Sequence, residues 1–308
     1  MPTAVFTHPA CLDHDPGRGH PESPARLRVV LEALKRPEFA ALKWREAPRA
    51  TDEQLERVHD RTYIAQLMFA IPQVGVVDVT LDTAVSAGSG EAALRAAGAV
   101  CAAVDAVMGG EASNAFCPVR PPGHHAGRDH PMGFCLFNNI AVAAMHARAA
   151  HGLKRIAVVD FDVHHGNGTQ DAFAADPDLF YGSTHQWPAY PGTGAASETG
   201  VGNIFNAPLA PQSGSAEFRA AMTRIILPAL SDFSPEFVLM SAGFDAHAGD
   251  PLASLRLHED DFLWVTQQVR GAASALCKGR LVSTLEGGYE LTALAESAAA
   301  HVRGLMAS

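Results

Sequence analysis

The chain has 308 residues, of which 47% are hydrophobic and 18% charged, and its formal net charge at pH 7 is -10. This length and composition predict one large globular domain that buries about three quarters of the surface exposed by the unfolded chain. The negative charge argues against a surface for nucleic acid or anionic membranes, so we expect neither as a direct partner.

The cysteines and the first residues bear on location. An odd number of cysteines without a Cys-x-x-Cys pair suits reduced thiols better than a disulfide framework or a thiolate zinc site. They are Cys11, Cys101, Cys117, Cys135 and Cys277. The start, MPTAVFTHPACLDHD, lacks a charged region followed by an apolar one, and no window of the chain is apolar for long enough to cross a bilayer. We therefore expect a cytoplasmic location.

Apolar runs alternate with Ala-rich helical patterns along the chain. Strands are predicted at Ala4–Thr7, Asn114–Val119, Ile156–Phe161, Leu179–Ser183, Asn203–Pro208, Phe237–Ser241 and Leu281–Leu285. Helices are predicted at Gly90–Met108, Asn138–Ala150, Ala216–Leu230, Glu259–Leu276 and Leu291–Met306. This alternation predicts an α/β fold, with a mostly parallel central sheet covered by helices on both faces. Because no repeat, low-complexity tract or Pro/Ser linker interrupts the pattern, we expect residues 1–308 to form a single domain.

The most informative stretch is residues 156–168, which read IAVVDFDVHHGNG. Asp160, Asp162 and His164 recur at every second position after an apolar run, so they project to one side while the chain stays extended. A strand end with solvated polar residues is the alternative interpretation. Three ionisable groups on one side of an apolar strand are costly, however, unless something pairs with them. The pattern therefore predicts a metal site, with Zn²⁺ favoured for mixed nitrogen and oxygen ligands.

Further polar segments follow other predicted strands. RPPGHHAG places the tandem His124-His125 after the strand at 114–119, AGFDAHAGDP places Asp245 after 237–241, and EGGYE places Tyr289 after 281–285. Each has a structural alternative, such as a solvated histidine loop or a helix-capping turn with a packed ring. Because the carboxyl ends of parallel strands form one crevice, we expect these segments to meet there.

The chemistry of these residues fits one reaction. Asp162, His164 and Asp245 offer a metal three nitrogen and oxygen ligands and leave a position for water, as in catalytic zinc sites. A histidine pair can act as general base and general acid, and Asp160 can orient a histidine from behind. Tyr289, carried on glycines, can donate a hydrogen bond to a developing oxyanion. The sequence thus predicts metal-assisted hydrolysis of an unactivated amide.

The motifs RPPGHHA, MGFCLFNN, VVDFDVHHGNGTQ, YPGTG, SAGFDAH and LEGGY resemble those of the histone deacetylase family, in particular its class II-like bacterial branch. The resemblance runs in order from HPESPARL at His20 to the last predicted helix. It implies the arginase–deacetylase α/β fold and a Zn²⁺ ion bound by Asp162, His164 and Asp245.

The resemblance also implies the remaining site residues. It pairs His124 with Asp160 and His125 with Asn167. At the position of Asn167 the class I enzymes carry Asp. The resemblance also makes Tyr289 the catalytic tyrosine. A tunnel with aromatic walls would hold the slender acyl-lysine stem. The implied substrate-binding residues are Gly133, Phe134, Tyr190, Gly287 and Gly288.

Members of this family also bind monovalent cations, usually K⁺, largely through backbone carbonyls. By position, one ion would contact Asp160, Asp162, His164, Ser183 and Thr184. A second would contact Phe173, Asp176, Leu179 and Asn203.

Two other functions remain as alternatives. In an arginase-type ureohydrolase, the corresponding motifs resemble Asp-x-His-x-Asp followed later by Asp-x-Asp. Their carboxylates bridge two Mn²⁺ ions. In this chain the residue two positions after His164 is Gly166, and the residue two positions after Asp245 is His247. Both positions lack the carboxylate that a second metal would need, which favours a single zinc. An inactive acyl-lysine-binding module would keep the tunnel but lack a catalytic group, and every proposed group is present.

The substrate is left open among acetyl-lysine on proteins, acetylated polyamines and other small amides. We expect residues 70–90 and HPESPARL to line the rim, with Ser86 as a candidate for selectivity. A structural salt-bridged turn is the favoured alternative for His20, Glu22 and Arg26. A homo-oligomer is compatible with the sequence.

Overall fold

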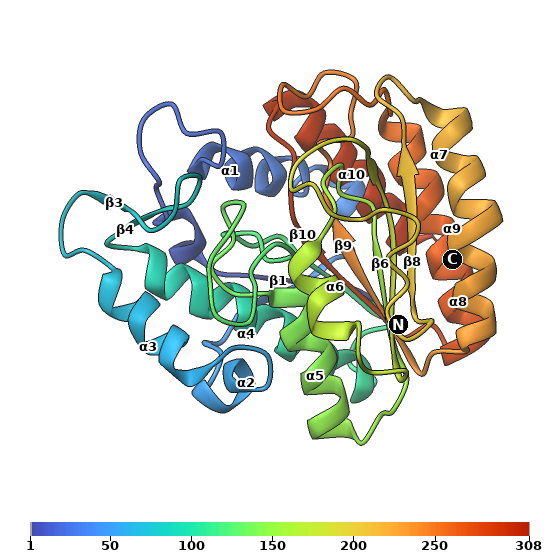
Figure 1. Ribbon diagram of the computed structural model, residues 1–308, viewed down its shortest axis with the longest axis horizontal. Helices are drawn as coiled ribbons and strands as arrows, with labels where there is room; N and C mark the ends of the chain where they lie inside the picture. Colours follow the sequence, from blue (N-terminus) through green and yellow to red (C-terminus); the bar gives the residue numbers. More distant parts are fainter. Residues whose placement is uncertain (1, 308) are drawn as a thin grey trace.

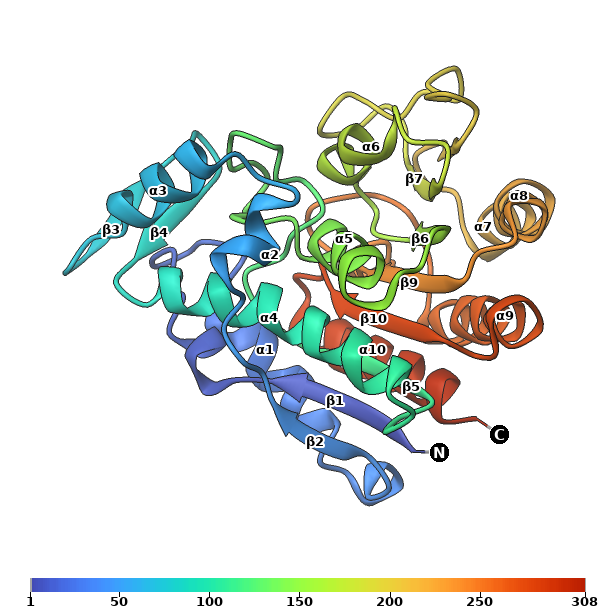
Figure 2. The ribbon, with the colours of Figure 1, turned by 90° about the horizontal axis from the view of Figure 1, so that it is seen from below.

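A computed structural model describes residues 2–307, and its central feature is an eight-stranded sheet in the order β2-β1-β5-β10-β9-β6-β7-β8 (Figure 1). Every pairing within this sheet is parallel, which confirms the predicted α/β class. The strands are β1 (Thr3–Thr7), β2 (Lys43–Glu46), β5 (Asn114–Cys117), β6 (Ile156–Asp160), β7 (Leu179–Gln186), β8 (Ile204–Leu209), β9 (Phe237–Ala242) and β10 (Leu281–Leu285). In Figure 2 they follow one another from β2 at the bottom towards β7 near the top.

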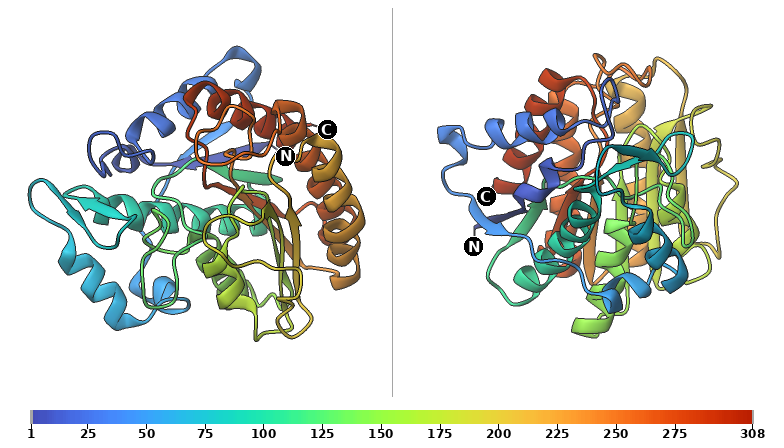
Figure 3. Two further views of the ribbon diagram at one scale, coloured as in Figure 1. Left: turned by 45° about the horizontal axis from the view of Figure 1, so that its top comes forward. Right: turned by 90° about the vertical axis from the view of Figure 1, so that its left-hand side faces the viewer.

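Helices cover both faces of the sheet, as the left view of Figure 3 shows. One core cluster joins the sheet to α4 (Ser89–Met108) and α5 (Asn139–His151). The other joins it to α1 (Pro24–Ala33), α7 (Ser215–Ala221), α8 (Leu227–Phe233), α9 (Glu259–Cys277) and α10 (Leu291–Met306). The alternation of side chains along β6 explains the two cores, because Ile156 and Val158 enter the first whereas Ala157 and Val159 enter the second.

A smaller lobe lies beside the sheet, at the left of Figure 1. It contains α2 (Asp52–Glu56), α3 (Arg61–Ala70) and an antiparallel hairpin of β3 (Val76–Asp78) with β4 (Ala84–Ser86). Among residues 2–307, no helix has the combination of length and hydropathy needed to span a membrane.

The predicted elements are found with small shifts, and several others were not predicted. β2 is exposed at every residue because it lies at the edge of the sheet, so KWRE carries no apolar run. The predicted helix at 216–230 is divided by the π-helix η3 (Met222–Ile226) into α7 and α8. α6 (Asn167–Phe173) and α1 were not predicted; α6 is a short helix with few apolar residues, which gives a weak periodic signal.

The order of the central strands assembles the site. β5, β10, β9 and β6 lie side by side, and their carboxyl ends meet at one edge because they are parallel. The segments after them carry His124 and His125, Tyr289, Asp245, and Asp162 with His164, respectively. The four polar segments predicted to meet at one crevice are therefore neighbours in space.

Candidate metal and catalytic site

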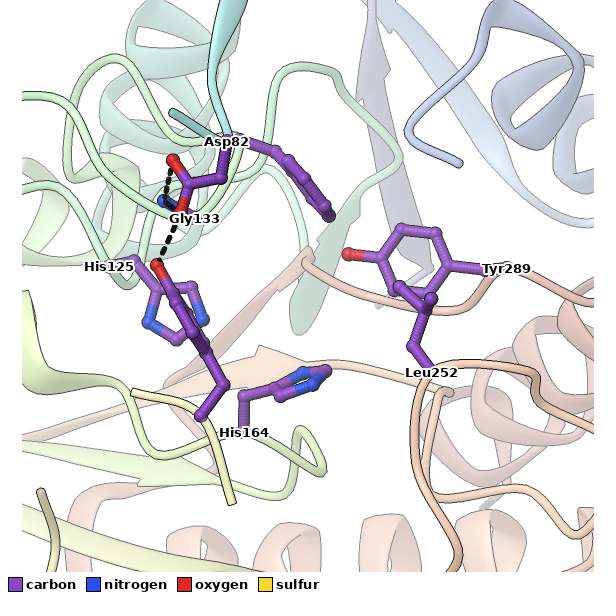
Figure 4. Close-up of a pocket in the computed structure, with 8 residues that line it drawn as sticks. Asp82, His125, Gly133, His164, Leu252 and Tyr289 are labelled. Carbon is purple, nitrogen blue, oxygen red and sulfur yellow. Dashed lines mark hydrogen bonds between the residues drawn. The ribbon is translucent and has the colours of Figure 1, made fainter. Parts of the chain in front are cut away.

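A cavity of about 210 Å³ opens at this edge of the sheet (Figure 4). Its lining residues are Asp82, His125, Gly133, Phe134, His164, Tyr190, Leu252 and Tyr289. The cavity thus brings together residues from six separate segments of the chain, and six of the eight were predicted as site residues.

Three predicted metal ligands converge at the base of the cavity. Nδ1 of His164 lies 3.3 Å from Oδ1 of Asp162 and 3.1 Å from Oδ2 of Asp245. Both carboxylates are only 1% exposed. One ligand atom from each of these three residues lies within 4.8 Å of the other two, an arrangement that can hold a metal ion. Mixed carboxylate and imidazole ligands suit Zn²⁺.

The charge balance of the cluster also fits a bound cation. Burial and the neighbouring Asp162 raise the pKa of Asp245 to about 7. Burial opposes a charged His164, but its hydrogen bonds to both carboxylates raise its pKa to about 10. Two buried carboxylates therefore have to share the positive charge of histidine, and a divalent cation at the same place would neutralise both.

Backbone groups hold the two carboxylates in place. The amide of Gly287 donates to Oδ2 of Asp162 at 2.7 Å, and that of Val163 donates to Oδ1 of Asp245 at 2.9 Å. Gly287 is required here because a Cβ atom would lie 2.0 Å from Oδ2 of Asp245. Gly287 and Gly288, predicted to bind substrate, do not line the cavity. The amide of Gly287 donates to the Asp162 carboxylate, and the carbonyl of Gly288 accepts a hydrogen bond from Arg26.

The tandem histidines form the two predicted pairs. His124 donates from Nδ1 to Asp160 at 3.0 Å, and Nδ1 of His125 lies 2.8 Å from Oδ1 of Asn167. Their rings lie 4.0 Å apart, and only His125 lines the cavity. The hydroxyl of Tyr181 also donates to the Asp160 carboxylate, at 3.0 Å.

The environments of the two histidines separate their pKa values. Burial acts against a charged His124, but Asp162 and Asp160 raise its pKa to about 10. Burial, followed by the charges of His124 and His164, lowers the pKa of His125 well below its usual range. Such separation produces one histidine that holds a proton and one that can accept it.

Tyr289 lies across the cavity from His125, and Figure 4 shows its hydroxyl pointing into the cavity. Burial raises its pKa well above the usual value, so the phenol is a neutral hydrogen-bond donor. The guanidinium of Arg26 lies 4.6 Å from the ring centroid and supports the ring. The backbone amide of Tyr289 donates to Asp250 at 2.7 Å.

The predicted aromatic walls line the cavity. Phe134 packs edge-to-face against Tyr289, with ring centroids 5.9 Å apart, and Tyr190 packs in the same way against His125 at 5.2 Å. Gly133 has a positive φ of 57°, and a Cβ there would lie 2.4 Å from Cδ2 of His125, so only glycine fits.

Asp82 and Leu252 line the cavity but were not identified by sequence reasoning. The Asp82 carboxylate accepts hydrogen bonds from the Tyr190 hydroxyl at 2.7 Å and from the Gly133 amide at 3.3 Å, so it joins the two walls (Figure 4). It falls within the predicted rim at 70–90. No further pattern marked either residue.

Other rim predictions have mixed outcomes. Ser86 is wrong as a selectivity candidate, because it is buried outside the cavity lining and its hydroxyl accepts from the amide of Asp15 at 3.0 Å. The salt-bridged turn is confirmed for Glu22, whose buried carboxylate contacts Arg26 at 2.9 Å and also binds Arg120. His20 packs edge-to-face on Phe134 at 4.8 Å.

The two predicted K⁺ sites differ in how well they fit an ion. In the first, Asp160 pairs with Ser183 in the β6–β7 register, and the buried hydroxyl of Thr184 has no hydrogen-bond partner among residues 2–307. This oxygen is available to coordinate a cation.

In the second site, the carbonyls of Phe173, Asp176 and Leu179 all accept from Nδ2 of Asn203, at 2.9, 3.0 and 2.6 Å. The amide nitrogen lies where these carbonyls converge. An ion could bind there only if the Asn203 side chain moved away.

Comparisons with known proteins agree with this geometry. The chain matches the histone deacetylase domain over residues 20–305. It is 44% identical over 310 residues to the histone deacetylase-like amidohydrolase of Pseudomonas aeruginosa, covering 93% of this chain and 81% of that protein. It is 39% identical over 323 residues to the chloroplastic histone deacetylase 14 of Arabidopsis thaliana, covering 98% and 76%.

Among solved structures, the HDA15 HD domain superimposes with a TM-score of 0.93 at 36% identity, over 99% of this chain and 88% of that one. The fold is therefore that of the histone deacetylases, and the protein is a member of the histone deacetylase family.

Proposed function

We propose that this protein is a zinc-dependent deacetylase that removes acetyl groups from amines such as acetyl-lysine or an acetylated polyamine. The observation that carries the proposal is the convergence of Asp162, His164 and Asp245 beneath a cavity also lined by His125 and Tyr289. When bound to these ligands, Zn²⁺ would supply an acidic water and polarise the amide carbonyl.

The histidines divide the proton transfers between them. His125 faces the cavity and has the lower pKa, so we assign it the removal of the proton from water. His124 is kept protonated by Asp162 and Asp160, and its positive charge keeps the neighbouring His125 neutral until His125 accepts the proton. Protonation of the leaving amine completes the amide cleavage, and the histidine pair provides that proton.

Tyr289 and the aromatic walls complete the assignment. The neutral hydroxyl of Tyr289 donates to the substrate oxygen as that oxygen becomes negative. Phe134 and Tyr190 provide faces for a slender alkyl stem, which keeps the charged part of the substrate outside and water away from the reacting amide.

The two alternatives have less support. A ureohydrolase with two metals needs further carboxylates, but position 166 is Gly, and His247 accepts from the Gly249 amide through Nδ1 and faces Glu259 through Nε2 at 3.5 Å. An inactive acyl-binding module has no need for opposed histidine pKa values beside a metal-ligand cluster.

The remaining assignments follow from the same proposal. The partners are an acetyl-lysine protein or a small acetylated amine, without direct binding of nucleic acid or membrane, and a homo-oligomer is compatible with it. K⁺ at the first site would be a structural ion, and the cytoplasm is the proposed location.

Turnover of an acetyl-lysine peptide, N-acetylputrescine and N-acetylspermidine by the zinc-loaded enzyme tests the reaction and ranks the substrates. No turnover of any amide would contradict the proposed function.

The metal assignment predicts that Asp162→Ala and Asp245→Ala each lose bound zinc and amide hydrolysis, because two remaining ligands hold the ion poorly. Elemental analysis of the purified variants measures the loss. Asp260→Ala, which removes an exposed carboxylate, is the matched control and should keep zinc. Wild-type zinc content in both ligand variants would exclude this site.

The proton-transfer assignment predicts that His125→Ala loses turnover on the order of 100-fold while still binding zinc and a hydroxamate. The reason is that His125 moves protons and does not hold the metal. Rates, zinc content and hydroxamate titration should be compared with His130→Ala, an exposed histidine in the same segment. Loss of zinc from His125→Ala would show that the ligands and proton carriers are wrongly divided.

The oxyanion assignment predicts that Tyr289→Phe lowers turnover about 100-fold, roughly 3 kcal/mol, because the ring stays and only the donor is removed. Zinc content, thermal stability and substrate affinity should change little. Steady-state kinetics with an acetylated substrate and a thermal melt provide the test. A near wild-type rate would make Tyr289 a packing residue.

A further inference from the structure

Glu286, the residue that follows β10, is fully buried and has no part in the chemistry assigned above. Oε2 of its carboxylate accepts from the backbone amides of Gly123 at 2.7 Å and His124 at 3.2 Å. Oε1 accepts from the hydroxyl of Ser241 on β9 at 3.1 Å. The side chain therefore reaches from the end of one central strand to the turn that carries the tandem histidines.

Two contacts hold the backbone of this turn at His124. The carbonyl of His124 accepts from the amide of Thr169 at 3.2 Å, so the backbone of His124 is held on one side by Thr169 and on the other by Glu286. Gly123 cannot be replaced by a bulkier anchor, because a Cβ atom there would lie 2.5 Å from the amide nitrogen of Asn139. Without Glu286, two buried N–H groups would lose their acceptor, a loss that proteins rarely tolerate.

An ion pair does not explain the residue. The positive charge of His124 favours the ionised form of the Glu286 carboxyl group. The negative charges of Asp160 and Asp162 disfavour that form. Arg26 approaches Glu286 but donates to its backbone carbonyl, at 2.5 Å. A carboxyl group placed beside two acids is unfavourable unless its oxygen atoms have a specific task. Accepting the two turn amides is such a task, and an oxygen can do it in either protonation state.

We propose that Glu286 is a positioning residue whose carboxyl oxygen fixes the His124–His125 turn against the sheet edge that carries the metal ligands. The inference rests on the proposed function, because it assigns the proton transfer to that turn. The backbone of the same segment holds other parts of the site: Gly287 binds the Asp162 carboxylate, and the carbonyls of Glu286 and Gly288 hold Arg26 beneath Tyr289. Through its side chain, Glu286 connects the turn of His124 and His125 to the same segment.

The test compares three variants of the zinc-loaded enzyme. Glu286→Ala removes the acceptor, Glu286→Gln keeps a neutral acceptor oxygen of nearly the same shape, and Ser241→Ala removes only the third contact. We expect Glu286→Ala to lower kcat about 100-fold, because displacing a catalytic group by about 1 Å has an effect of this size. Its KM and zinc content should stay close to wild type. Glu286→Gln should restore most of the rate, and Ser241→Ala should be nearly unaffected.

The outcomes separate a positioning role from a merely structural one. An unchanged kcat in Glu286→Ala would overturn the proposal, as would a Glu286→Gln variant as slow as Glu286→Ala, because the charge and not the accepting oxygen would then matter. Loss of zinc from Glu286→Ala would also overturn it, by moving the role to the metal ligands. If the alanine variant does not fold, Glu286→Leu fills the volume without an acceptor and replaces it.

Failure of the proposed function is distinguishable from failure of this inference. If the wild type does not hydrolyse acetylated amines, the proposed function fails, and the turn can still be examined by the imidazole resonances of His124 and His125 in nuclear magnetic resonance spectra. Glu286→Ala should shift or broaden both, whereas Glu286→Gln should leave them near their wild-type positions. Unchanged resonances in Glu286→Ala would reject the positioning role.

Discussion

Two buried carboxylates, those of Asp162 and Asp245, face the same nitrogen of His164 at the edge of the sheet. Placing like charges in the interior is unfavourable, and each of these groups is compensated by a backbone amide as well as by the histidine. The close approach of the backbone to both carboxylates requires glycine at position 287, directly after β10. The need to hold these two groups therefore determines much of the surrounding backbone.

The same constraint explains the opposed behaviour of the histidines. His124 lies between Asp160 and Asp162 and takes up positive charge, whereas His125 lies next to His124 and His164 and is kept neutral. Across the cavity, burial keeps the phenol of Tyr289 protonated. His125, the proposed proton acceptor, and Tyr289, the proposed hydrogen-bond donor, thus face one cavity beside the candidate metal ligands, while the charged His124 packs against His125. This arrangement suits the proposed hydrolysis of an unactivated amide.

Much of this arrangement could be predicted, because strands with long apolar runs and polar residues at their carboxyl ends give strong local signals. The exposed strand β2 and the short helix α6 could not, since neither has an apolar period of sufficient length. Asp82 reaches Tyr190 across 108 positions, and Glu286 reaches His124 across 162. Such contacts depend on strand order, which is a property of the packed chain and leaves no local pattern.

The most direct test of the central claim is anomalous X-ray diffraction at the zinc edge from crystals of the purified protein. The account predicts one strong anomalous peak within bonding distance of Asp162, His164 and Asp245, at about 2.0–2.2 Å from their oxygen and nitrogen atoms. A fully zinc-loaded protein without a peak at these residues, or with its zinc bound elsewhere, would contradict the account.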